Sequence, residues 1–256
     1  PYGAKSPVEK TARQERLARG RQLEMQKYSR RMSKRVLKVL RAQSSESSRR
    51  VAQGQAPIPL DYQTRWAAQL YEAKRADSMG AARDGWDIVE AQHALKEVTT
   101  TTIPANFGGD PEFLVGVGAD PSETPGENFF QTSPVRQNVN DYLRETSRLE
   151  AGTHADKINA VAGALREEIV HTATGEPRGL SSGELARALR STMFSYDNSY
   201  ANLIGRTTTT WAYNEGSKGR YVEAGVRKMQ WYATADELTC PFCSQLHGKI
   251  VSVEKK

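Results

Sequence analysis

Cys240 and Cys243 are the only cysteines of the 256-residue chain, and they form a C-x-x-C motif around Pro241 and Phe242. Two thiolates at this spacing can hold one Zn²⁺ from a turn between two strands. A structural zinc site needs four ligands, and a lone thiol pair also fits a redox pair or two plain thiols. We therefore predict only half of a metal site, Cys240 and Cys243, and Zn²⁺ binding would need further ligands beyond residue 256.

Positive charge is concentrated near the other end of the chain. The first 55 residues contain fifteen Lys/Arg and four Asp/Glu, whereas the whole chain has a formal charge of only +6. A basic segment on a mildly acidic body is typical of proteins that contact nucleic acid or dock on an acidic surface. Tyr28 is the only aromatic residue near the densest cluster, so we expect contact with double-stranded DNA to be independent of sequence. The predicted DNA- or partner-binding residues are Arg30, Arg31, Lys34, Arg35, Lys38 and Arg41.

The same segment carries an apolar pattern. Five residues recur at spacings of three and four, which places them on one face of a helix. This face predicts that the helix packs on a partner helix while its cations stay solvated. The same helix can both pack in this way and contact DNA. The predicted packing residues are Met25, Tyr28, Met32, Val36 and Val39.

No constellation of residues predicts catalysis. The four histidines lie in unrelated contexts, and the sequence contains no phosphate-binding loop of the G-x-x-x-x-G-K-[ST] type. We therefore predict a protein that is not an enzyme and has no catalytic residues. Because no run of about 18 apolar residues occurs, we expect no membrane partner. The cysteine count and the lack of an apolar N-terminal stretch favour use in the cytoplasm or inside a particle assembled there.

The pattern of helix and strand signals predicts a mostly α chain with a small α+β C-terminal module. We expect an extended basic N-terminal helix, broken at the serine-rich run 44–48, then a helical middle, and a long helix followed by a β-hairpin with a C-x-x-C turn. Further breaks are expected at 152–155 and 195–197, a turn at 175–179, and a capping box at Ser181–Glu184. The segments are a basic helical arm (1–55), a helical segment (56–98), a Pro/Gly/Thr-rich loop (99–134), a helical region (135–204) and a truncated C-terminal core (205–256).

The C-terminal core has a distinctive order of motifs. A helix with Arg-Thr at its start and Asn near its end leads to a Gly-Val turn, a strand with Trp, an Asp before the C-x-x-C, and a Leu-x-Gly-Lys. This order resembles the phage Mu F-like head morphogenesis family, whose members are minor head proteins. Residues 1–135 give no resemblance. The residues that carry it are Arg206, Thr207, Asn214, Gly216, Gly225, Trp231, Asp236, Gly248 and Lys249.

The resemblance implies a minor capsid protein of a tailed bacteriophage, assembled in the host cytoplasm and placed inside the virion head near the portal vertex. The implied partners are the portal protein and packaged double-stranded DNA, with scaffold or major capsid protein as further candidates. The implied role is in head assembly, DNA packaging or ejection. Family members usually continue into a His-Pro-x-Cys-Arg segment, which would complete the zinc site, and this sequence ends before it. The alternatives are an effector or toxin-linked enzyme of the same family and a sequence-independent DNA-binding accessory protein.

Overall fold

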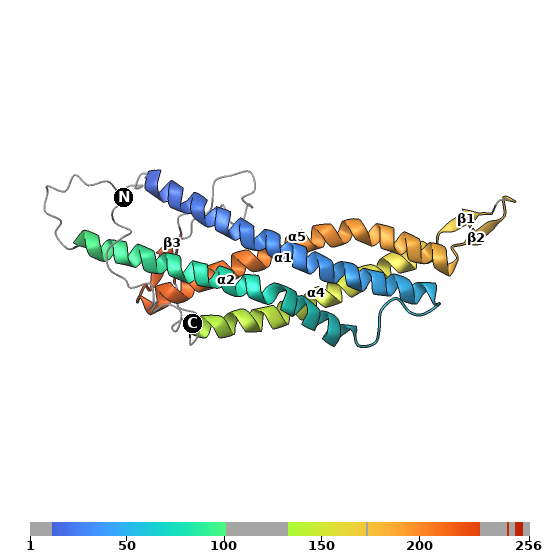
Figure 1. Ribbon diagram of the computed structural model, residues 1–256, viewed down its shortest axis with the longest axis horizontal. Coiled ribbons are helices and arrows are strands. Elements are labelled where there is room, and N and C mark those ends of the chain that lie inside the picture. The colour runs from blue at the N-terminus through green and yellow to red at the C-terminus, as the bar shows by residue number, and fades with distance from the viewer. Residues whose placement is uncertain (1–11, 101–132, 173, 231–244, 246–248, 253–256) are drawn as a thin grey trace. The chain divides into compact units, whose positions relative to one another are not determined.

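The computed structural model describes residues 12–100, 133–172, 174–230, 245 and 249–252. These residues form long helices and two short hairpins (Figure 1). The fold class predicted from the sequence is confirmed: the chain is mostly helical, with a small antiparallel hairpin after a long helix. In chain order the elements are α1 (Ala12–Ala52), α2 (Tyr62–Thr100), α4 (Pro134–Arg166), β1 (Ile169–His171), β2 (Pro177–Gly179), α5 (Ser182–Glu223), β3 (Lys228–Gln230) and β4 (Ile250–Ser252).

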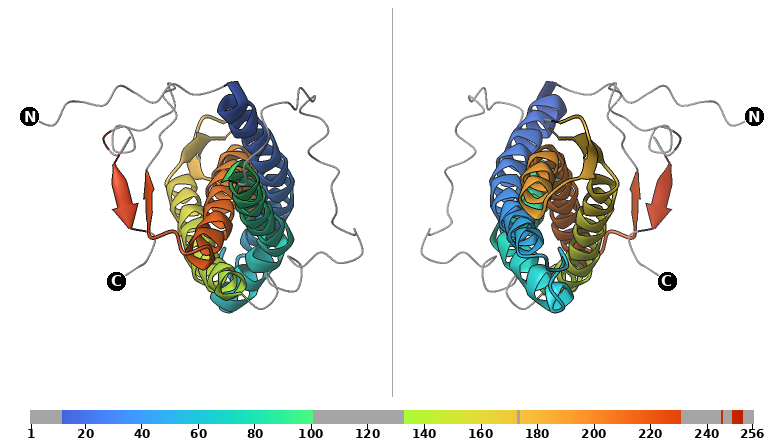
Figure 2. Two further views of the ribbon diagram at one scale, coloured as in Figure 1. Left: turned by 90° about the vertical axis from the view of Figure 1, so that its left-hand side faces the viewer. Right: turned by 90° about the vertical axis from the view of Figure 1, so that its right-hand side faces the viewer.

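The chain divides into two compact units. The first, called the bundle unit here, comprises residues 1–81 and 140–211, and the second unit comprises 82–139 and 212–256. In the bundle unit, parts of α1, α2, α4 and α5 surround one core, as the end-on views show (Figure 2). Burial of large apolar side chains from every helix stabilises this unit. The core includes Met32, Val36, Leu40, Trp66, Leu70, Ile158, Leu189, Met193 and Ile204.

Helix α1 continues without interruption through its serine-rich run, so the predicted break at residues 44–48 is wrong. Serine is expected to weaken a helix because its hydroxyl competes for backbone hydrogen bonds. Here the Ser48 hydroxyl donates to the Ser44 carbonyl oxygen one turn earlier, at 2.9 Å. Glu46 accepts a hydrogen bond of 2.6 Å from Arg65 of α2. Contacts with neighbouring helices therefore override the local preference.

Two further predicted breaks are also absent. Helix α4 runs through residues 152–155, and α5 runs through residues 195–197. The reason is burial: Ala151 and Ala155 of α4 lie in the core, and Asp197 of α5 is buried with hydrogen-bond partners on other helices. The predicted capping box does open α5, because the Ser181 and Glu184 side chains each bond the other residue's backbone N–H.

Each hairpin pairs two three-residue strands in antiparallel register. In the first, Val170 lies opposite Arg178, where the sequence predicted a helix end and a simple turn. In the second, Met229 lies opposite Val251, as expected for the strands that flank the C-x-x-C segment. Gly225, between α5 and β3, has a φ of 71°, a left-handed conformation that glycine adopts without strain at a helix end.

The second unit has a smaller core, whose buried apolar residues include Trp86, Val89, Val135, Val139 and Tyr213. Helices α2 and α5 approach closely here. A Cβ atom added to Gly216 would overlap the backbone carbonyl of Ala82, so only glycine fits this position without a shift.

Candidate functional site

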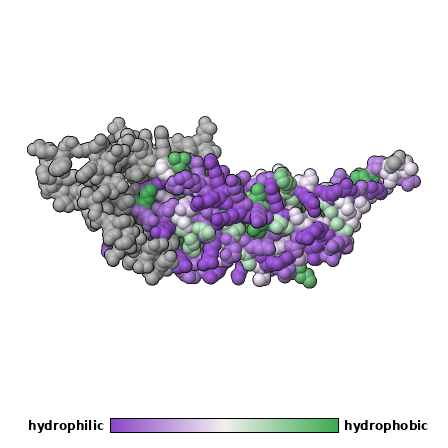
Figure 3. Space-filling model, viewed as in Figure 1, coloured by the Kyte–Doolittle hydropathy of each residue, from purple (hydrophilic) through white to green (hydrophobic). Residues whose placement is uncertain are grey.

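The outer face of α1 presents three of the six predicted binding cations. Arg30, Lys34 and Lys38 are exposed and follow one another at four-residue spacing. Successive side chains on this stripe are about 6 Å apart along the helix axis. Among the described residues, no carboxylate pairs with any of the three, whereas Lys27 pairs with Glu24 on the same helix. We call Arg30, Lys34 and Lys38 the outer basic stripe. Figure 3 shows that most of the described surface on one side is hydrophilic, with apolar residues in small separate groups.

The other three predicted cations have partners within the bundle unit. Arg31 and Arg35 contact the two carboxylate oxygens of Asp77 on α2, at 3.1 and 3.3 Å, and the Asp77 side chain is only 4% exposed. Arg41 donates to the Asn198 side chain on α5 at 3.2 Å and lies over the Phe194 ring, 4.3 Å from its centroid. These three side chains join α1 to its neighbours.

The predicted packing stripe of α1 faces helices of the same chain. Met32 and Val36 are fully buried in the core, and Val39 packs against it. Met25 and Tyr28 are half-buried, and the Tyr28 ring lies against Gly80 of α2. The helices that α1 meets through this stripe therefore include α2 of its own bundle.

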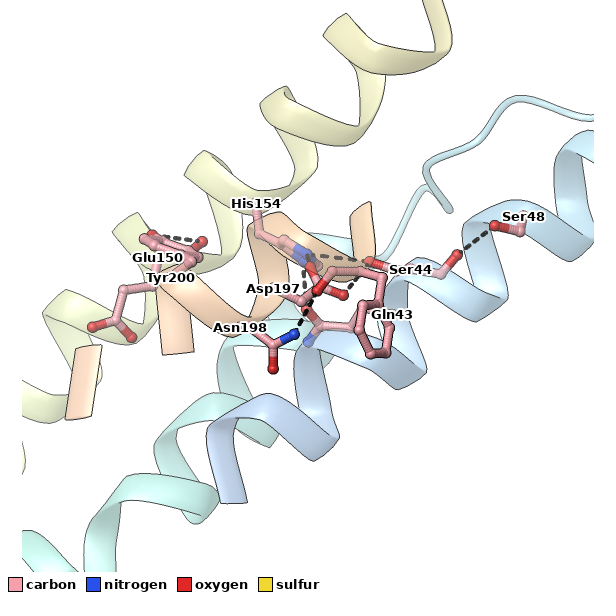
Figure 4. Close-up of polar contacts among 9 residues, drawn as sticks. Gln43, Ser44, Ser48, Glu150, His154, Asp197, Asn198 and Tyr200 are labelled. Atoms are coloured by element: carbon pink, nitrogen blue, oxygen red, sulfur yellow. Dashed lines mark hydrogen bonds and ion pairs between the residues drawn. The ribbon is translucent and has the colours of Figure 1, made fainter. Parts of the chain in front are cut away.

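A buried polar cluster crosses the core of the bundle unit (Figure 4). His154 of α4 is fully buried, and its Nε2 donates to Asp197 of α5 at 2.9 Å. The Ser44 hydroxyl of α1 donates to the other oxygen of the same carboxylate, also at 2.9 Å. On the far side of the ring, Nδ1 lies 3.0 Å from Oε1 of Gln43. Both ring nitrogens thus have an oxygen atom of a neighbouring helix within hydrogen-bond distance.

This cluster contains the three residue types of a hydrolase triad, but its geometry does not support nucleophilic catalysis. In a triad the hydroxyl and the carboxylate lie on opposite ring nitrogens, so that the ring can take a proton from one while the other orients it. Here Ser44 and Asp197 both lie on the Nε2 side of His154, at 3.4 and 2.9 Å. All three side chains are buried, so a substrate cannot reach the hydroxyl. The cluster satisfies buried polar groups and fixes the relative register of three helices.

A second buried pair lies one helical turn away on α4. The Lys74 ammonium of α2 is fully buried and contacts Glu150 at 2.6 Å and the Thr146 hydroxyl at 3.0 Å. Burial lowers the pKa of Lys74 and raises that of Glu150, and in each case the partner's charge opposes the shift. Burial also raises the pKa of Tyr200, whose hydroxyl contacts the Glu150 carbonyl, to about 12. Lys74 and Glu150 therefore form a pair in which each charge offsets part of the other's cost of burial.

The polar cluster was not found from the sequence, because the members that come from different helices are at least 43 residues apart along the chain. One signal was present. Helix α4 has an apolar stripe through Val139, Leu143, Ile158 and Ala162, and His154 lies within it. A polar residue inside such a stripe indicates a buried partner, although it does not identify that partner.

The residues that carried the family resemblance have different surroundings. Gly216 permits the close approach to Ala82, and Gly225 ends α5. Arg206, Thr207, Asn214 and Lys249 are exposed. Trp231, Asp236, Cys240, Cys243 and Gly248 lie outside the described residues, so the half metal site stays a prediction.

Comparison with known proteins finds a similarity for the C-terminal part of the chain. The family model described as Phage Mu protein F like protein matches residues 168–256. This segment begins just before β1 and includes all of α5 and the β3–β4 hairpin. The resemblance predicted from the C-terminal motifs is thus confirmed: residues 168–256 are similar to the phage Mu F-like head morphogenesis family. Searches of curated proteins and of solved structures found no match. None of the described helices combines the length and the apolar character needed to cross a membrane.

Proposed function

We propose that the protein is a minor head protein of a tailed phage, held at the portal inside the head, and that it contacts packaged double-stranded DNA through the outer basic stripe. The proposed DNA contact rests on a difference among the six predicted cations: three have partners within the bundle unit and three do not. Arg30, Lys34 and Lys38 are exposed and have no carboxylate partner among the described residues, in a chain whose C-terminal part belongs to a head morphogenesis family.

The properties of duplex DNA favour contact of these cations with its phosphate groups and not with its bases. Duplex DNA carries one negative charge per roughly 1.7 Å of its axis, so cations about 6 Å apart on a helix can each neutralise a phosphate. No aromatic side chain belongs to the stripe, so base stacking does not contribute. Three phosphate contacts give an expected slope of log affinity against log salt of about −3.

The DNA contact is tested by fluorescence anisotropy of a duplex of random sequence, titrated with the full chain at several salt concentrations. Changing Arg30, Lys34 and Lys38 together to Gln should reduce the slope to near zero and abolish measurable binding at moderate salt. The matched control changes three exposed cations on α2 and α4, Arg75, Lys157 and Arg166, to Gln, with the same change in net charge. If both triple variants lose affinity equally, net charge and not the stripe attracts DNA.

The place in the particle needs a separate experiment. We expect the chain to co-purify with the portal oligomer of the same phage at moderate salt, and a cryo-EM map of the portal vertex should contain the bundle unit. Assembled heads that lack the protein would contradict the proposal. A protein that binds DNA but is missing from heads would favour the DNA-binding accessory alternative.

A further inference from the structure

Helices α1 and α5 of the bundle unit meet along a seam that has two contact points. At one of them, Arg41 of α1 donates to the Asn198 side chain at 3.2 Å. At the other, Gly205 lies so close to α1 that a Cβ atom added to it would overlap the Ser33 hydroxyl. Asn198 and Gly205 are seven residues apart, or roughly two helical turns, so the same side of α5 faces α1 over this span.

Two polar residues of α5 lie at the solvent edge of this seam. Asn202 and Arg206 are exposed, and they are one helical turn apart, with Gly205 directly before Arg206. Gly205 touches α1 at the two serines that directly precede Arg30 and Lys34. Arg206 therefore lies across the seam from the outer basic stripe, at the same level along the two helices.

Neither helix contributes a carboxylate to the seam. Helix α1 has no Asp or Glu between Glu24 and Glu46, and α5 has none between Asp197 and Glu215. Each of these four flanking carboxylates already has a hydrogen-bond partner in the chain. Among the described residues, no carboxylate forms an ion pair with Arg206.

The neighbouring helices pack on other sides of α1 and α5. Helix α4 contacts α5 through Tyr200 and Trp211, which do not lie on the side that faces α1. Helix α2 meets α1 where its buried carboxylate, Asp77, is paired with Arg31 and Arg35. The cations along the seam of α1 and α5 therefore share one positively charged surface, which attracts a polyanion.

We propose that one phosphate strand of duplex DNA lies along this seam and is held from two helices, by the outer basic stripe of α1 and by Asn202 and Arg206 of α5. The inference rests on the proposed DNA contact and extends it to a second helix. The axes of packed helices are about 8–10 Å apart, so side chains from both can reach one strand above the seam. The Arg206 guanidinium can donate two hydrogen bonds to one phosphate, and the Asn202 amide adds an uncharged donor.

The test measures the affinity of the full chain for a fluorescent duplex of random sequence at several salt concentrations. Arg206→Gln should weaken binding about fivefold near physiological salt and make the slope of log affinity against log salt shallower by about 1, because one phosphate contact is lost. Asn202→Ala should weaken binding about two- to tenfold with an unchanged slope, because it removes a hydrogen bond and no charge. The matched control is Arg166→Gln, at an exposed arginine on α4 with the same change in net charge, which should leave affinity and slope unchanged.

Chemical protection gives a second measurement on the unchanged protein. Phenylglyoxal modifies exposed arginines, and mass spectrometry of the digested chain reports the extent of modification at each one. Bound duplex should slow the modification of Arg206 and Arg30 several-fold and leave that of Arg166 unchanged. Because no residue is replaced, this result does not depend on how a variant folds.

Three outcomes would overturn the inference. The first is an Arg206→Gln variant that binds DNA like the unchanged protein, the second is equal modification of Arg206 with and without DNA, and the third is the same loss from Arg166→Gln as from Arg206→Gln. If Arg206→Gln has no effect while the triple variant of the outer basic stripe loses binding, the proposed DNA contact stands and only its extension to α5 is wrong. If the triple variant also binds normally, the proposed DNA contact is itself wrong.

Discussion

The interior of the bundle unit and the outer face of α1 both carry charged side chains, but in different settings. Inside, His154, Asp197 and Lys74 are buried, Glu150 is largely buried, and each has a hydrogen-bonding partner on another helix. Outside, the cations of the outer basic stripe are exposed and have no carboxylate partner among the described residues. Residue type alone therefore does not separate a cation that is held by a carboxylate of the same chain from one that is open to solvent. Arg30 and Arg31 are neighbours in sequence, yet only Arg31 is held by Asp77.

The largest effect should come from the interior. His154→Ala removes a buried ring and its hydrogen bond with the buried Asp197 carboxylate, so we expect a loss of about 3–5 kcal/mol in the free energy of unfolding. Urea denaturation followed by circular dichroism measures it. The matched control, His171→Ala at an exposed position on β1, should change stability by less than about 0.5 kcal/mol. Equal effects at the two histidines would mean that the buried cluster does not stabilise the bundle.

The next largest effect concerns Asp77, the buried carboxylate that holds Arg31 and Arg35 of α1. Asp77→Ala removes the shared partner of Arg31 and Arg35, and we expect a loss of about 1–3 kcal/mol. It also releases two cations beside the outer basic stripe. The slope of log affinity against log salt for DNA binding should therefore become steeper by up to about 2, because Arg31 and Arg35 could then contact phosphates. Asp141→Ala, which breaks an exposed pair with Arg144, is the control for stability and should cost less than about 1 kcal/mol. Unchanged DNA binding in the Asp77 variant would mean that Arg31 and Arg35 do not contribute to DNA binding even when they are released.

A smaller effect concerns the pH dependence of the interior. The pKa of Tyr200 is raised to about 12 by burial, from an ordinary value of 10.0. The folded state therefore keeps a proton that the unfolded chain loses, so this contribution is present below about pH 10 and is lost as the pH rises towards 12. In near-ultraviolet titration, the latest phase of tyrosinate formation should be missing in Tyr200→Phe. The alkaline loss of stability should also be shallower in that variant. An unchanged late phase would assign it to another tyrosine.

The smallest effect is expected on the outer face. Single changes of Arg30, Lys34 or Lys38 to Gln should each alter the free energy of unfolding by less than about 0.5 kcal/mol, since these side chains are exposed. The same denaturation measurement checks this. A loss above 1 kcal/mol at any of them would show that the stripe also has a structural role.

Local patterns predicted much of the helical fold and the C-terminal hairpin. The stripe from Met32 to Val39 and the Ser181–Glu184 capping box are local signals, because their residues meet within one or two helical turns. The continuity of α1 through residues 44–48, and of α4 and α5 through their predicted breaks, was not predictable from such signals. Those segments are held helical by contacts with residues far away in the sequence.

The candidate site was predictable only in part, for the same reason. Clustering of cations on α1 follows from spacing, but the partner of Arg31 and Arg35 is Asp77, which another helix supplies. Likewise, Ser44, His154 and Asp197 come from three helices and have no common motif. The position of Arg206 across from the outer basic stripe depends on how α1 and α5 pair along their seam, which neither helix specifies alone.

The packing of α5 against α1 and α2 has a consequence for which gene segments can be exchanged by recombination. The family segment, residues 168–256, contains α5 but neither α1 nor α2, yet Leu189, Met193 and Ile204 of α5 lie in a core shared with those helices. A gene fragment that encodes this segment alone would produce an apolar helix face open to water, which favours aggregation. The unit that recombination can exchange is therefore larger than the segment that the family resemblance marks, and a chimaera would need to bring the companion helices with it.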